Sequence, residues 1–114
     1  MTDEGSKKSI LSLLSIMQRA GKLQSGELQV ETAVKALKAL HVVVAENASA
    51  NTKKLFTDKC AFYKVPITFF GTKEELGHAI GKEERSSLAI TDEGFAKSFQ
   101  KKMSNLEKIM KESD

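Results

Sequence analysis

The chain contains 114 residues with a mass of 12.5 kDa, which is the size of one ordinary domain. Hydrophobic residues make up 40% and charged residues 29%, a balance typical of a globular protein rather than a disordered one. The 18 Lys and Arg residues against 15 Asp and Glu residues leave a net charge of only +3. This excludes nucleic-acid binding by bulk charge alone, so any such binding must come from a local surface.

Residue types exclude several other protein classes. Cys60 is the only cysteine, so no internal disulfide can form, and one Cys with two His provides no zinc-ligand set. No long apolar run follows the first lysines, as a signal peptide would need. No stretch approaches the roughly 18–20 apolar residues of a membrane span. We therefore expect a cytoplasmic protein without a cofactor, metal ion or membrane segment.

The first part of the chain predicts a helix, a short strand and a second helix. Apolar residues recur at helical spacing over 10–17, with Ser6 as the expected N-cap and Gly21 as the closing residue. Residues 22–24 could form a brief strand, and Ser25-Gly26 is typical of a helix entry. The buried stripe of this second helix is predicted to comprise Val30, Ala33, Val34 and Leu37.

The rest of the chain continues this alternation. The apolar, β-branched run 40–45 predicts a strand covered on both faces, and a helix is expected over 51–63 before Pro66 prevents its continuation. Further strands are predicted at 67–70 and 87–91. The last two helices are expected to begin at the capping box formed by Thr72 and Glu75, and at the cap residue Asp92. This order predicts one α/β domain with a largely parallel sheet between helices.

No catalytic constellation can be assembled from the sequence. Cys60 lies on the apolar stripe of its predicted helix, which favours a packed core thiol over a nucleophile. His41 and His78 have no carboxylate partner at a recognisable spacing, and no glycine-rich phosphate loop is present. We therefore expect a protein that is not an enzyme.

Three segments could bind an anionic polymer. The first is the helix start at Ser25-Gly26, where backbone N–H groups and the helix dipole favour a phosphate. The second is the polar loop 46–49, which contains Asn47. The third is a charged loop, whose alternative interpretation is a solvated surface segment. It comprises Lys82, Glu83, Glu84, Arg85 and Ser86. Spacing alone leaves open whether the three segments share one edge of the sheet.

Residues 72–81, together with Pro66, resemble the "P…SKxELGxAxG" stretch of the L7Ae/L30e ribosomal protein family, whose members bind kink-turn RNA. The fuller pattern resembles the bacterial YlxQ branch of that family. Further matching pieces occur in order at 18–23, 25–27, 51–54, 57–60, 62–63 and 89–92. The resemblance covers roughly residues 7–100 of a single RNA-binding domain, with residues 101–114 as a C-terminal helical extension.

The resemblance implies a three-layer α/β/α sandwich with a mixed four-stranded sheet, which amends the largely parallel sheet expected from alternation. It also implies that the three segments lie together on an RNA-binding face. It places the family's RNA-binding motif on Gly26, Glu27, Leu28, Gln29 and Thr32. Gly26 and Gln29 match that motif, whereas Leu28 replaces a usual Asn or Lys and Thr32 replaces a usual Lys. Two groups that would bond a base or a phosphate are therefore missing.

The function implied is non-catalytic RNA binding in translation, on a kink-turn-like or internally looped RNA. We expect the partner to be structured RNA, within a ribosome or another ribonucleoprotein, and the protein to be a monomer. Lys22, Lys82 and Arg85 are the expected phosphate-neutralising residues. The alternative is a protein-interaction adaptor on the same fold with weak or lost RNA binding, which Leu28 favours as an exposed apolar anchor.

Overall fold

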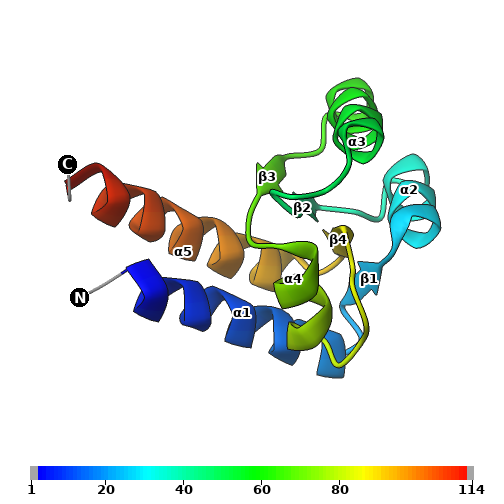
Figure 1. Ribbon diagram of the computed structural model, residues 1–114. Coiled ribbons are helices and arrows are strands. Elements are labelled where there is room, and N and C mark those ends of the chain that lie inside the picture. The colour runs from blue at the N-terminus through cyan, green and yellow to red at the C-terminus, as the bar shows by residue number, and fades with distance from the viewer. Residues whose placement is uncertain (1–2, 113–114) are drawn as a thin grey trace.

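The computed structural model describes residues 3–112 as five helices around a four-stranded sheet (Figure 1). The helices are α1 (Asp3–Arg19), α2 (Glu27–Lys35), α3 (Ala50–Tyr63), α4 (Lys73–Ala79) and α5 (Glu93–Glu112). The strands are β1 (Leu23–Ser25), β2 (His41–Val44), β3 (Ile67–Phe69) and β4 (Ser87–Ile90). Helices α2 and α3 cover one face of the sheet, and α1, α4 and α5 cover the other. The three-layer α/β/α architecture is therefore confirmed.

The sheet is mixed, with strand order β1-β4-β2-β3. Strands β2 and β3 are parallel, whereas β4 is antiparallel to both of its neighbours. The prediction of a largely parallel sheet, made from the alternation of helices and strands, is wrong. The mixed sheet implied by the family resemblance is confirmed. The reason lies after α4, where residues 82–86 return alongside that helix and Arg85 N–H donates to the Lys73 carbonyl at 3.0 Å. The chain therefore enters β4 at the edge where β3 ends.

Two local expectations at the ends of helices fail. Helix α1 begins at Asp3, so Ser6 lies inside it and does not cap it. Helix α2 ends at Lys35, and Leu37 adopts a left-handed conformation with φ 60° in the following turn. Leu37 is consequently 71% exposed and does not extend the buried stripe. Gly21 does close α1, because Lys22 N–H donates to the Met17 carbonyl across it at 3.0 Å.

The core lies on both faces of the two central strands. All four residues of β2 and all four of β4 are buried, as the apolar run predicted for β2. Phe56 of α3 covers one face, while Leu14 of α1 and Phe99 of α5 belong to the same buried cluster. Leu106 is also buried, so α5 contributes to the core beyond residue 100. Within residues 3–112, no helix is long and apolar enough to cross a membrane.

His41 begins β2 and is buried as a neutral side chain. Its Nε2 lies 2.7 Å from Thr68 Oγ1, and its Nδ1 lies 3.3 Å from Gln100 Nε2. An amide nitrogen can only donate, so Nδ1 accepts and the ring proton sits on Nε2. The ring also packs edge-on against Phe99 at a centroid distance of 5.0 Å. Burial lowers the pKa of His41, because the imidazolium would lose its hydration.

This lowered pKa predicts that acid destabilises the fold. Between the folded pKa of His41 and the ordinary value of about 6.5, the unfolded chain binds a proton that the folded chain does not. The free energy of unfolding should therefore decrease as pH falls below about 6.5, by at most about 1.4 kcal/mol per pH unit. Urea unfolding at pH 7.5 and 5.5 measures the change. His41→Gln should reduce this pH dependence, and His78→Gln is the control substitution at an exposed position.

Candidate nucleic-acid interface

One edge of the sheet collects four chain segments. Strands β1, β2 and β3 end there and β4 begins there, and backbone hydrogen bonds continue the pairing beyond the strands. Gly26 N–H donates to the Ser87 carbonyl at 3.1 Å, and Ala45 N–H donates to the Ser86 carbonyl at 2.9 Å. Glu46 N–H donates to the Gly71 carbonyl at 2.7 Å. The start of α2 and the segments 46–49, 71–74 and 82–86 thus form one surface, here called the loop edge.

The start of α2 offers backbone donors to the loop edge. Gly26 is its N-cap, with φ 93° and ψ 152°, and no side chain caps the helix. The first-turn N–H groups of a helix have no intrahelical acceptor, and the dipole adds a partial positive charge. A Cβ placed on Gly26 would meet no atom within 4 Å, so the space in front of this residue is open. A phosphate can therefore approach the backbone closely here.

Arg85 fixes segment 82–86 to the end of β1. Its Nε donates to Ser25 Oγ at 3.3 Å and its Nη1 donates to the Glu84 carbonyl at 2.9 Å. Lys82 and Glu83 are exposed on the same segment, and Ser86 is half-buried. The guanidinium group of Arg85 is therefore held between its own segment and the end of β1, while Lys82 is exposed on the same segment.

The same segment packs closely on α4 at Gly77, which is buried inside that helix. A Cβ on Gly77 would overlap the carbonyl oxygen of Glu83 and lie 2.6 Å from its carbonyl carbon. Only a residue without a side chain leaves room for the backbone at this crossing. Gly77 thereby allows the backbone of residues 82–86 to pack directly against α4.

Asn47 holds two of the segments together. Its Oδ1 accepts from Lys73 N–H at 2.8 Å, and its Nδ2 donates to Glu74 Oε1 at 3.1 Å. The hydrogen bond from Asn47 is the main cause that lowers the pKa of Glu74. Through these two bonds Asn47 positions the loop edge, while one amide hydrogen and one oxygen lone pair of this exposed side chain remain for a ligand.

The exposed surface of α2 carries the remaining predicted residues. Glu27, Leu28, Gln29 and Thr32 are all exposed, and Leu28 is exposed to 72%. Gln29 and Thr32 line a groove of about 290 Å³ between α2 and β1, to which Gln24 also contributes. Gln24 was not among the predicted residues, although strand alternation opposite the buried Leu23 points it outward.

Lys22 is a predicted residue that lies away from the loop edge. It precedes β1, and its carbonyl accepts from Thr91 N–H at 3.0 Å, where β4 ends. It therefore lies at the opposite end of the strand from Ser25. Lys73 occupies the loop edge instead, at the start of α4, together with the α3 residue Thr52, which hydrogen-bonds Glu27. No local sequence pattern predicts a binding role for Lys73 or Thr52, because only the tertiary structure brings them to the loop edge.

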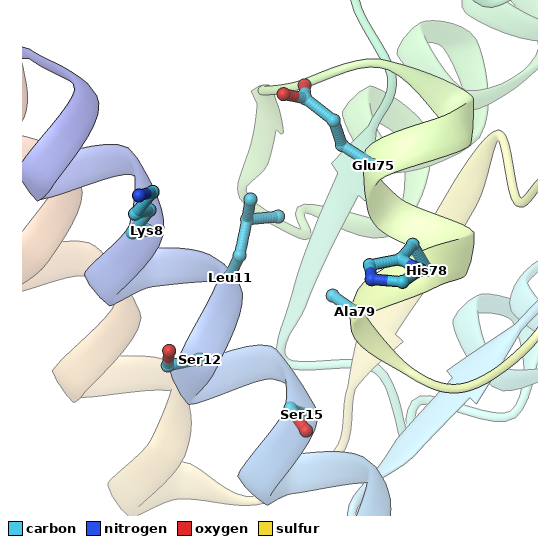
Figure 2. A pocket seen from close by; sticks show the side chains of 7 residues that line it. All are labelled: Lys8, Leu11, Ser12, Ser15, Glu75, His78 and Ala79. Atoms are coloured by element: carbon cyan, nitrogen blue, oxygen red, sulfur yellow. The ribbon is translucent and has the colours of Figure 1, made fainter.

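A separate groove of about 460 Å³ lies between α1 and α4 (Figure 2). Lys8, Ser12 and Ser15 line it from α1, and Glu75 and His78 line it from α4. No hydrogen bond joins His78 to either serine within residues 3–112, whereas an activated serine would need such a bond to its base. Burial raises the pKa of the Cys60 thiol to about 11, which leaves it protonated at neutral pH. The described part of the chain also contains no cluster of three His, Cys, Asp or Glu side chains that could hold a metal ion.

Comparison with known proteins identifies the family. A model of the ribosomal protein L7Ae/L30e/S12e/Gadd45 family matches residues 8–100. The chain belongs to this family. It is 45% identical over 84 residues to the RNA-binding protein YlxQ of Bacillus subtilis, covering 74% of this chain and 84% of that protein. It is 39% identical over 95 residues to YlxQ of Enterococcus faecium, covering 83% and 91% respectively. The resemblance to the YlxQ branch is thus confirmed.

Solved structures of other proteins share the fold of this L7Ae-family chain. A Bacillus halodurans protein described as having unknown function superposes with a TM-score of 0.80 at 37% identity, covering 83% of this chain and 96% of that one. The Giardia lamblia 15.5kD RNA binding protein superposes with a TM-score of 0.76 at 19% identity, covering 94% and 92%. At that low identity the second likeness concerns the fold alone.

Proposed function

We propose that this chain is a non-catalytic RNA-binding protein of the translation apparatus that recognises a kink-turn-like or internally looped RNA. Its partner would be structured RNA in a ribosome or another ribonucleoprotein, bound by a cytoplasmic monomer. The observation that carries the proposal is the loop edge, where an uncapped helix start, a fixed arginine and a polar loop meet on one surface. Membership of a family whose YlxQ relatives are named RNA-binding proteins supports the same conclusion.

In the proposed mechanism, backbone N–H groups at the start of α2 hold one phosphate next to Gly26. Gln29 reads a base edge from the adjoining helix surface, and Glu27 accepts a hydrogen bond from a base amino group or a ribose hydroxyl. Lys82 and Arg85 neutralise the phosphates of the flanking strand. Glu83 and Glu84 lie among these cations, so the surface selects by shape and uses few phosphate contacts.

A protein-interaction adaptor is the second candidate. Leu28 favours it, because this side chain is 72% exposed on an otherwise polar surface. An adaptor would show no preference for a bent RNA over a straight one. It would also lose partner binding, and not RNA binding, when Leu28 is shortened to alanine.

Titration of wild-type protein against two RNAs tests the proposal. One RNA is a duplex interrupted by a kink-turn, and the other is an uninterrupted duplex of the same length. We expect binding at least about tenfold tighter to the kink-turn RNA, because the loop edge matches a bent backbone with accessible bases. The affinity should decrease as the salt concentration rises. The slope of log affinity against log salt concentration should correspond to only a few phosphate contacts. Equal affinity for the two RNAs would contradict specific recognition and favour the adaptor.

Restoring the family motif should strengthen binding. Leu28→Asn combined with Thr32→Lys adds a base-edge group and a phosphate-binding ammonium on the exposed surface of α2. We expect about tenfold tighter binding of the kink-turn RNA and a salt slope steeper by about one phosphate.

A matched control for this variant makes the same chemical changes away from the loop edge. Leu37→Asn combined with Thr57→Lys uses an equally exposed leucine and an exposed threonine on α3. The control should gain little affinity and should not distinguish the two RNAs. If both double variants bind equally well, the gain comes from charge alone and the α2 surface is not the binding site.

A further inference from the structure

A chain of three polar side chains connects the start of α3 to the start of α2. Thr52 Oγ1 donates to Glu27 Oε1 at 3.3 Å, and Ser49 Oγ donates to Thr52 Oγ1 at 3.0 Å. Ser49 is the N-cap of α3, and its Oγ accepts from Thr52 N–H at 3.1 Å. Thr52 therefore contacts the N-cap of its own helix and the first residue of the neighbouring one.

The direction of these hydrogen bonds is fixed by chemistry. An ionised carboxylate can only accept, so the single hydroxyl proton of Thr52 goes to Glu27. The oxygen of Thr52 then accepts, and the single hydroxyl proton of Ser49 goes to it. Since Ser49 accepts from the backbone N–H of Thr52, every proton in this chain is used once. Within residues 3–112, the second carboxylate oxygen of Glu27 has no partner.

We infer that Thr52 is a positioning residue for RNA recognition, which holds the Glu27 carboxylate ready to accept a hydrogen bond from a base or a ribose hydroxyl. This inference rests on the proposed function. A free glutamate side chain has many rotamers and loses conformational entropy when it is ordered on binding. The hydrogen bond from Thr52 already restricts the Glu27 side chain in the free protein, so less entropy is lost when RNA binds.

Thr52→Val removes the hydroxyl while it keeps the shape of the side chain and the backbone N–H that bonds Ser49. We expect the affinity for the kink-turn RNA to fall about three- to tenfold, with an unchanged thermal midpoint. Thr52→Ser retains the hydroxyl and should bind within about twofold of wild type. Thr57→Val is the matched control on the same helix. Its hydroxyl has no partner within residues 3–112, so its affinity should not change.

A double-mutant cycle separates positioning from a general structural effect. If Thr52 acts through Glu27, then Thr52→Val should have no further effect once Glu27→Ala has removed the carboxylate. Additive losses in the double variant would overturn the inference and leave the proposed function standing. Absence of any RNA preference in the wild-type protein would overturn both.

A measurement without RNA tests the contact itself. In NMR spectra of the free protein, Thr52→Val should shift the side-chain carboxyl carbon resonance of Glu27. The corresponding resonance of Glu31 should stay in place, because Glu31 pairs with Lys35 and Lys59, one turn further along α2. An unchanged Glu27 resonance would show that Thr52 does not hold the carboxylate.

Discussion

Gly26→Glu should weaken RNA binding by roughly 10- to 100-fold while the protein still folds. The new carboxylate would stand in front of the α2 N–H groups and repel the phosphate that they are proposed to hold. Its side chain has room, since a Cβ at this position meets no atom within 4 Å. The positive φ of 93° costs a residue with a side chain about 1–3 kcal/mol of stability. RNA titration well below the unfolding midpoint, together with urea unfolding, measures both effects.

Gly21→Glu is the matched control for this variant. Gly21 also has a positive φ, of 72°, and open space around its Cβ position, but it closes α1 at the opposite edge of the sheet. The Gly21→Glu substitution therefore introduces the same charge at another position of positive φ, away from the loop edge. We expect some loss of stability and near-normal RNA affinity. Equal loss of RNA affinity in the two variants would show that the start of α2 is not the docking point.

Gly77→Ala should both destabilise the protein and weaken RNA binding. Alanine is favoured over glycine inside a helix by about 1 kcal/mol, so a stabilising effect would be the default expectation. Here the added methyl group overlaps the backbone carbonyl oxygen of Glu83, which no side-chain rotation can relieve. Residues 82–86 must then move off α4, at a cost of about 1–3 kcal/mol, and Arg85 loses its place beside Ser25. Urea unfolding and RNA titration should both report a loss.

Gly94→Ala provides the comparison on α5. There the nearest atom to the added Cβ is a side-chain oxygen of Asp92 at 3.3 Å, which can shift slightly. We expect stability within about 1 kcal/mol of wild type and unchanged RNA affinity. A Gly77→Ala protein that is more stable than wild type and binds RNA normally would mean that segment 82–86 is not fixed by its packing on α4.

Helix starts were predictable where the signal lies within a few residues. Thr72 and Glu75 form the expected capping box, with hydrogen bonds of 3.1 and 2.9 Å in the two directions. Asp92 caps α5 by accepting from Phe95 N–H at 3.0 Å. The prediction of Ser6 as an N-cap is wrong, because α1 begins three residues earlier, at Asp3. A serine is compatible with both the cap and the interior of a helix.

The family resemblance predicts the residues of the α2 surface, because it supplies their order along the chain. It does not predict the contacts that support them. Thr52 and Glu27 are 25 positions apart, and Asn47 lies 26 positions from the backbone N–H of Lys73. Such bonds leave no local pattern, since they depend on two segments ending at the same edge.

Sequence patterns alone predict the succession of helices and strands, the fully buried central strand β2 and the polar character of the three loops. Those features follow from side-chain period and capping, which act over about one turn of helix or one strand. The direction of β4, the exposure of Leu37 and the position of Lys22 at the far edge depend on how the chain packs in three dimensions. Each of these depends on where the chain returns after a turn, and the packing of segment 82–86 over Gly77 sets that return for β4.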